Sequence, residues 1–219
     1  FNDHIPVFST EKETNTLTIT FKEPVKPIAQ KKPVQKKRSP VYNKVIVLDA
    51  GHGGRDPGAV VKGASYEKVY TLDVAKRVKA LLEKEGAYVI MTRNNDITRS
   101  LTSRVYISRK EKADMFISVH LNSFSESSAR GSKTFYYKSK DKKLATHLSK
   151  QLGHDLDIKN NGVARQRFYV LRHTKMPSVL LEPLFMTNPT EKALIKSPDF
   201  RNKLALSIYQ GVKNYYSDS

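Results

Sequence analysis

Three short apolar segments of the sequence each end in a histidine or a glutamate. His52 follows VIVLDAG, His120 follows MFISV, and Glu182 ends SVLLE, while Glu67 opens a helical pattern. Two imidazoles and one carboxylate, with a fourth position left open, form the ligand set of one class of catalytic zinc site. A second carboxylate beside such a site can act as the general base in hydrolysis. The residues alone do not decide which glutamate has which role.

A parallel β-sheet is the element that could bring these side chains together. Short segments rich in Val, Ile, Leu, Phe and Tyr alternate with amphipathic helical patterns along most of the chain. The alternation predicts an α/β fold, with a single twisted, mostly parallel sheet and helices packed on both faces. The working crevice of such sheets lies at the carboxyl ends of the strands, so His52, His120 and Glu182 are expected to meet at one edge. The predicted strands are 45–49, 88–92, 115–120, 134–137, 168–171 and 178–182, and the predicted helices lie within 66–86, 96–113, 141–156 and 199–216.

The glycines around His52 fit this interpretation. Gly51, Gly53 and Gly54 allow a tight turn at the end of a strand and keep Cβ atoms away from a metal or a substrate. The stretch lacks the Gly-Lys-Ser/Thr ending of a phosphate-binding loop, and its spacing differs from the dinucleotide-binding fingerprint. The sequence also has no His-Glu-x-x-His motif, so it does not match the thermolysin-type proteases.

The first fifth of the chain differs in composition from the rest. Residues 1–21 contain one alternating segment, NTLTITF, and we interpret them as the remnant of an N-terminal β-rich module. Residues 22–43 are expected to form a basic Pro/Lys-rich linker, because residues 22–44 hold eight Lys or Arg, four Pro and a single acidic residue. Residues 44–219 are expected to form the catalytic domain.

The formal net charge of the chain is +18, from 39 Lys and Arg against 21 Asp and Glu. This balance favours a polyanionic partner, such as nucleic acid, anionic lipid or the acidic polymers of a bacterial cell wall. Nucleic acid is disfavoured, because neither interleaved aromatic residues nor a recognition fold accompanies the basic segment. The absence of cysteine excludes disulfides and thiolate metal sites. No stretch approaches the ~20 apolar residues of a transmembrane span.

A series of ordered motifs covers the whole candidate domain. The motifs are IVLDAGHGGRDPGA, YEKVYTLDVAKRVKALLE, VIMTR, SLTSRV, ADMFISVHLNS, GSKTFYY and FYVLRHTKMPSVLLEPLFMTNPTE, followed by the last helix. In order and spacing they resemble the zinc-dependent N-acetylmuramoyl-L-alanine amidases of bacterial cell walls, the amidase_3 family. The resemblance implies that His52, Glu67 and His120 bind Zn²⁺ and that Glu182 is the catalytic carboxylate. It also implies hydrolysis of the amide between N-acetylmuramic acid and L-alanine in peptidoglycan, in cell-wall remodelling, daughter-cell separation or autolysis.

Several neighbouring residues are candidates for supporting roles. Asp49 is expected either to orient a histidine ligand through a hydrogen bond or to cap the turn. Asn122 and Arg165 are candidates for substrate contacts by position alone. Leu121 and residues 183–185 depart from the family pattern. Leu121 is expected to add bulk beside the metal, and residues 183–185 are expected to narrow or reshape the cleft.

The resemblance also leads to expectations about accessibility and location. Some relatives carry an inhibitory helix where this chain has only FSESSAR, so we expect an open, constitutively accessible site. We expect a monomer that is exported to the cell envelope, either periplasm or cell wall, with the signal peptide absent from this chain. Its basic surface is expected to attract anionic wall polymers.

Two other functions remain open at this point. A catalytically silent peptidoglycan-binding module would keep the fold, although an intact set of ligands with Glu182 argues against it. A zinc peptidase acting on wall-derived peptides would use a comparable site and differ only in its products. A nucleic-acid binder ranks third, because charge is its only support.

Overall fold

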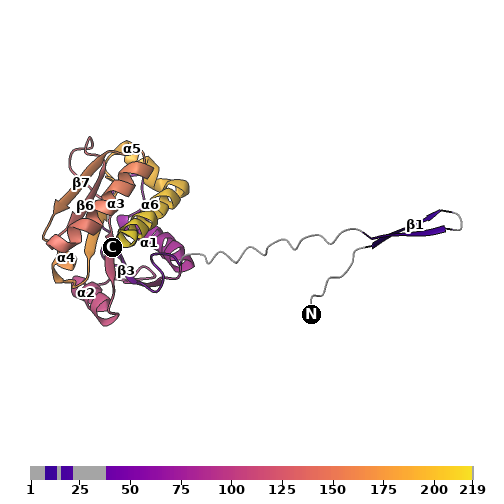
Figure 1. The fold of residues 1–219 in the computed structure, drawn as a ribbon. Coiled ribbons are helices and arrows are strands. Elements are labelled where there is room, and N and C mark those ends of the chain that lie inside the picture. Colours follow the sequence, from indigo (N-terminus) through magenta and orange to yellow (C-terminus); the bar gives the residue numbers. More distant parts are fainter. Residues whose placement is uncertain (1–7, 14–15, 22–37, 219) are drawn as a thin grey trace. The chain divides into compact units, whose positions relative to one another are not determined.

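The computed structural model of the protein describes residues 8–13, 16–21 and 38–218. These residues fall into two compact units, the second of which begins at Arg38 (Figure 1). The first unit contains a hairpin of two antiparallel strands, β1 (Phe8–Glu13) and β2 (Thr16–Phe21). The sequence predicted only the second of these strands. That this unit is the remnant of a larger β-rich module stays a prediction.

The second unit begins earlier than the sequence predicted. Residues 38–43 belong to the predicted linker, but Val41 is fully buried and the main-chain N–H of Asn43 donates to Gly86 O (2.9 Å). A Cβ atom at Gly86 would come within 2.6 Å of the Tyr42 ring, so the two residues are closely packed. A single buried apolar residue in a basic segment produces no periodic signal. The predicted start of the domain, residue 44, therefore lies after the start of the second unit, Arg38. Linker residues 22–37 lie outside the described residues.

A six-stranded sheet forms the centre of the second unit. Its strands are β3 (Val45–Ala50), β4 (Tyr88–Met91), β5 (Met115–Val119), β6 (Ser132–Tyr136), β7 (Asn160–Arg165) and β8 (Ser178–Glu182). Their order across the sheet is β4-β3-β5-β8-β6-β7, and all neighbours are parallel except the antiparallel pair β6 and β8. The predicted α/β class with a single, mostly parallel sheet is confirmed. The three strands that end near the candidate residues, β3, β5 and β8, are adjacent in this order.

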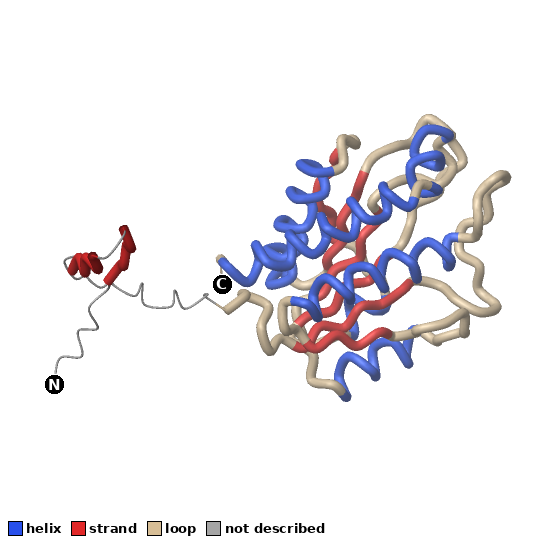
Figure 2. The backbone as a smooth tube through the Cα atoms, turned by 90° about the vertical axis from the view of Figure 1, so that its right-hand side faces the viewer, coloured by secondary structure: helices blue, strands red, loops and turns tan. Residues whose placement is uncertain are grey.

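Helices cover both faces of the sheet, as predicted (Figure 2). The helices are α1 (Glu67–Lys84), α2 (Leu101–Lys110), α3 (Lys142–Asp155), α4 (Tyr169–His173), α5 (Pro189–Lys196) and α6 (Pro198–Ser217), with a 3₁₀ turn at Ser139–Asp141. Ile46 and Leu48 of β3 belong to the larger core, which α1, α3 and α6 complete. Val47, which points to the opposite face, belongs to the smaller core beneath α2 and α4. Among the described residues, no helix has both the length and the apolar composition that crossing a bilayer requires.

The predicted elements differ from the structure in three places. Residues 168–171, predicted as a strand, instead form the start of helix α4. Val170 and Leu171 are buried, so the segment has the apolar composition of a buried strand. Four residues are too few to distinguish the periodicity of a helix from that of a strand. Neither β7 nor α5 is among the predicted elements. The sequence of β7, NNGVAR, belongs to an edge strand that needs no apolar run.

Candidate metal centre

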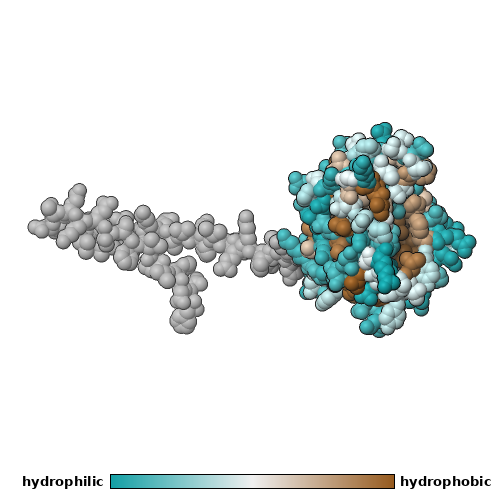
Figure 3. All heavy atoms as spheres, turned by 180° about the vertical axis from the view of Figure 1, so that it is seen from behind, coloured by the Kyte–Doolittle hydropathy of each residue, from teal (hydrophilic) through white to brown (hydrophobic). Residues whose placement is uncertain are grey.

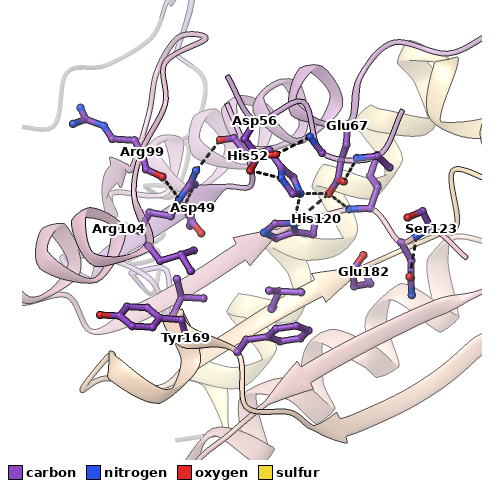
Figure 4. A pocket seen from close by; sticks show the side chains of 18 of the residues that line it. Asp49, His52, Asp56, Glu67, Arg99, Arg104, His120, Ser123, Tyr169 and Glu182 are labelled. Atoms are coloured by element: carbon purple, nitrogen blue, oxygen red, sulfur yellow. Dashed lines mark hydrogen bonds and ion pairs between the residues drawn. The ribbon is translucent and has the colours of Figure 1, made fainter. Parts of the chain in front are cut away.

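Three side chains from separate elements converge at the carboxyl edge of the sheet (Figure 4). His52 Nε2, His120 Nδ1 and Glu67 Oε1 form a triangle with three sides of 3.1 Å. Because β3 and β5 are parallel neighbours, the loops that carry the two histidines leave the same edge of the sheet. Glu67 reaches this edge because it is the first residue of the helix that follows β3.

The donor atoms of this triangle fit a divalent metal ion. Zn–N and Zn–O bonds of about 2.0–2.2 Å place the ligand atoms of a tetrahedral site roughly 3.3 Å apart, close to the spacing found here. Two imidazoles and one carboxylate suit zinc and neighbouring transition metals. Three protein ligands are also typical of catalytic metal sites, whose remaining position is open to water or substrate.

The main chain around Glu67 holds this candidate ligand in its ionised form. Its side chain is buried, and it accepts hydrogen bonds from the main-chain N–H groups of Ala59 (2.8 Å, to Oε2) and Leu121 (2.9 Å, to Oε1). Burial opposes ionisation of Glu67, but hydrogen bonds from His120 and His52 outweigh it and hold the pKa of Glu67 well below its usual value. The carboxylate is therefore ionised and oriented before any metal binds.

Asp56, which the sequence analysis missed, orients the ring of His52. Asp56 Oδ2 lies 2.8 Å from His52 Nδ1, and this contact turns His52 Nε2 towards Glu67 and His120. A carboxylate on the outer nitrogen of a metal-binding histidine fixes its tautomer and ring orientation. Burial alone would lower the pKa of His52, but Glu67 and Asp56 raise it above its ordinary value. The available signal was an aspartate four residues after the histidine, within the glycine-rich turn.

The loop that carries His52 has an unusual backbone. His52 itself lies in the left-handed region, with φ of 60°, where residues other than glycine are uncommon. Gly53 and Gly54 follow with φ of 128° and 59°. At Gly51, a Cβ atom would come within 2.4 Å of the His120 ring. The glycines thus serve both the turn and the close approach of the second histidine.

Asp49 has neither of the two roles expected for it. It is fully buried, and among the described residues its carboxylate accepts hydrogen bonds from Thr92 Oγ1 (2.7 Å), Ser118 Oγ (2.7 Å) and Arg104 Nη1 (2.5 Å) rather than from a histidine ring. Burial opposes its ionisation, but Arg104 and the two hydroxyls hold the pKa of Asp49 below its usual value. Its connection to the metal centre runs through Arg104, which donates to His52 O (2.7 Å).

Glu182 lies at the end of β8 and lines the same pocket as the three candidate ligands. The pocket has a volume of about 750 Å³. Glu182 Oε2 is buried and forms no hydrogen bond with any group in the described part of the chain. Burial, together with the negative charge of Glu67, raises the pKa of Glu182 to about 8. A carboxyl group in this state is a candidate for proton transfer.

The remaining predicted residues divide between the pocket and its surroundings. Asn122 and Leu121 line the pocket, so Leu121 does add bulk there. Residues 183–185 are not among those that line it, which corrects the expectation that they narrow the cleft. That they reshape it stays a prediction. Arg165 is exposed at the end of β7, where its guanidinium donates to Tyr137 O (2.9 Å), and it also lies outside the set of pocket-lining residues. Tyr169 and Phe168 of the α4 region, which the sequence analysis did not single out, do line the pocket.

Comparison with known proteins identifies the family to which this site and fold correspond. Residues 46–214 match the Amidase_3 family, described as N-acetylmuramoyl-L-alanine amidase. "Probable cell wall amidase LytH" of Staphylococcus saprophyticus is 42% identical over 181 residues, which are 82% of this chain and 60% of that protein. "N-acetylmuramoyl-L-alanine amidase LytC" of Bacillus subtilis is 36% identical over 194 residues, 87% of this chain and 39% of that protein. The chain thus spans between about two fifths and three fifths of the length of these relatives.

A solved structure extends the likeness to the fold. The catalytic domain of CwlV, an N-acetylmuramoyl-L-alanine amidase from Bacillus (Paenibacillus) polymyxa var. colistinus, superimposes with a TM-score of 0.77 at 35% sequence identity. The match covers 80% of this chain and 99% of that domain. The chain belongs to the Amidase_3 family of N-acetylmuramoyl-L-alanine amidases.

Proposed function

We propose that this chain is a zinc-dependent N-acetylmuramoyl-L-alanine amidase. Its reaction is hydrolysis of the amide that joins the lactyl group of N-acetylmuramic acid to the L-alanine of the stem peptide in peptidoglycan. The observation that carries the proposal is the position of Glu182 in the same pocket as the His52, Glu67 and His120 triangle. The family match and the names of the relatives support the same reaction and substrate.

Zinc is the metal that we assign to the triangle. Its preference for four ligands and for imidazole and carboxylate donors agrees with the His, Glu, His set and with the absence of cysteine. Once bound, zinc would polarise the scissile carbonyl and lower the pKa of a water molecule from ~16 towards ~7.

Glu182 supplies the proton transfers. Its Oε2 atom accepts no hydrogen bond from the described residues. In the ionised form, which a bound cation would favour, it can take a proton from the attacking water. The same carboxyl group then delivers that proton to the alanine nitrogen as the amide breaks, so the peptide leaves as a neutral amine. Asn122 and Leu121, which line the pocket, are placed to contact the substrate, and Asn122 is the candidate hydrogen-bonding group.

The surroundings of the pocket support direct access for a polymer. Residues 124–130 form an exposed loop without a helix, at the place where the sequence predicted an open site. We propose that the enzyme acts as a monomer in the cell envelope after export, and that its basic surface adsorbs to anionic wall polymers. On the face seen in Figure 3, hydrophilic residues surround separate hydrophobic patches.

The decisive experiment is product analysis on purified peptidoglycan with the zinc-loaded chain. We expect release of intact stem peptides with free N-terminal alanine. Cleavage within the peptide would instead support the peptidase alternative, and binding without any product would support the silent module. Glu182→Gln should reduce turnover by several orders of magnitude while the zinc content stays at one ion per chain, because the change removes the base but no ligand. A Glu182→Gln protein with substantial activity would contradict the proposed base.

A further inference from the structure

Two arginines are buried beneath the loop that carries His52. Arg93 is 1% exposed and Arg104 is 4% exposed. Burying a guanidinium group is costly unless its donors are satisfied, so the groups that accept from it indicate what it is there to hold. Arg104 pairs with Asp49 (2.5 Å), whereas Arg93 donates to main-chain carbonyls and one hydroxyl of the described residues.

The two side chains donate hydrogen bonds to the main-chain carbonyl groups of three successive residues. Ala50 O accepts from Arg93 Nε (2.9 Å) and Arg104 Nη1 (2.8 Å). Gly51 O accepts from Arg93 Nη2 (2.9 Å), and His52 O accepts from Arg104 Nη2 (2.7 Å). These are the peptide groups that lead into and out of the left-handed backbone of His52. Their orientation sets the direction in which the imidazole points.

Arg93 also reaches the helix that begins with Glu67. Its Nη2 donates to Lys68 O (2.8 Å) and to Thr71 Oγ1 (3.1 Å), and the Thr71 hydroxyl donates to Gly51 O (2.8 Å). One guanidinium therefore joins the His52 loop to the first turn of α1. At Gly53, a Cβ atom would come within 2.8 Å of Arg93 Cδ and Nε, so the absence of a side chain there makes room for this arginine.

We infer that Arg93 and Arg104 are positioning residues of the metal centre, which hold His52 and Glu67 in register before an ion binds. The inference rests on the proposed zinc function and extends it to two residues that are not among the candidate metal ligands. The role depends on the planar, forked guanidinium, which can donate to several fixed carbonyls at once; a lysine keeps the charge but loses the fork.

The test is zinc affinity, measured by competition with a chelating dye on Arg93→Lys and Arg104→Lys. Each change should raise the zinc dissociation constant by about 10–100-fold, the usual effect of losing a group that orients a metal ligand. The matched control is Arg201→Lys. Arg201 of α6 is a partly buried guanidinium that also bonds a carboxylate, Asp73 of α1 (2.5 Å), and two main-chain carbonyls of α5, but none of its partners belongs to the loop that carries His52. The control should lose stability in urea yet keep wild-type zinc affinity.

The outcomes separate this inference from the function on which it rests. A wild-type chain that binds no zinc would refute the zinc site itself. Wild-type binding with unchanged affinity in both arginine variants, or an equal loss in Arg201→Lys, would refute the positioning role alone. If the arginine variants do not fold, the Thr71→Val variant provides the test, because it removes the hydroxyl that lies between Arg93 and Gly51 O. Weaker zinc binding by this variant would support the inference, and unchanged zinc binding would overturn it.

Discussion

Glu182 is a carboxyl group at the edge of the pocket, one of whose oxygens is shielded from water and has no hydrogen-bond donor among the described residues. Its Oε2 atom is buried without a partner among the described residues, and the nearest charge that acts unfavourably on it is Glu67. A structural carboxylate would be expected to have a compensating donor. The cost of leaving Glu182 unpaired is typical of a site that is arranged for chemistry rather than for stability.

This cost predicts how the stability of the metal-free protein depends on pH. Folding raises the pKa of Glu182 from 4.5 to about 8, so between these values the folded state retains a proton that the unfolded chain has lost. The contribution of Glu182 to stability is therefore complete below about pH 4.5 and is lost as the pH rises towards 8. The glutamine in Glu182→Gln does not titrate. Between pH 5.5 and 8.5, the free energy of unfolding of this variant should therefore rise relative to that of the wild type by up to about 3 kcal/mol.

Urea unfolding of both proteins in EDTA measures the difference directly. With zinc bound the difference should shrink, because a nearby cation favours the ionised carboxylate. A gap between variant and wild type that stays constant across this pH range would show that Glu182 titrates normally.

Asp56 provides a second prediction about a single side chain. Asp56→Asn keeps an oxygen near His52 Nδ1 but removes the charge, so zinc affinity should fall by about 10-fold. The matched control is Asp155→Asn, because Asp155 forms a similar 2.7 Å contact with His154 on α3, away from the metal centre. Equal zinc affinities for the two variants would mean that Asp56 does not support the ligand.

Helix α2 contributes to the site although none of its residues is a candidate ligand. It carries Arg104, and its first turn lines the pocket with Leu101. Few of its residues are buried, so its start depends strongly on the cap: the side chain of Ser100 accepts a hydrogen bond from the main-chain N–H of Ser103 (3.1 Å). Ser100 is therefore the N-cap of α2.

Ser100→Ala should therefore destabilise the domain by about 1 kcal/mol, the usual cost of losing such a cap. Thermal or urea unfolding of the metal-free protein measures the loss. Ser103→Ala is the matched control, because it removes a hydroxyl from the same turn and keeps the N–H that the cap uses. The idea fails if the two substitutions cost the same.

The net charge of +18 is a property of the whole chain, spread over a domain and a basic N-terminal segment. Charge of this kind acts over a distance set by salt, about 8 Å at physiological ionic strength and about 3 Å at 1 M. Adsorption of the purified chain to isolated cell walls should thus fall several-fold between 0.1 M and 1 M NaCl, as measured by co-sedimentation. Turnover of a small soluble muramoyl-peptide should change less, since the reaction depends on local contacts. Adsorption that is insensitive to salt would argue for specific rather than electrostatic binding.

Five strands of the six-stranded sheet, the main helices and the candidate ligands could be predicted from the sequence because each leaves a local signal; the edge strand β7 leaves none. Apolar runs such as VIVLDAG and MFISV are continuous since central parallel strands are buried on both faces. The rule that parallel strands end at one edge then brings His52, His120 and Glu182 together without any coordinates. The family resemblance assigned Glu67 and Glu182 their separate roles, which composition and spacing had left open.

Only the tertiary structure decided which contacts form between segments that are distant in the chain. Arg93 and Arg104 lie some forty to fifty residues from the carbonyls they hold, and their sequence neighbourhoods look like those of ordinary surface arginines. The same holds for Asp49, whose partners come from β5, from α2 and from the residue after β4. It also holds for α4, whose apolar residues give no period that distinguishes helix from strand. Periodic patterns record which face of an element is buried, but the partner of a polar side chain is set by how the elements pack, and that information is not local.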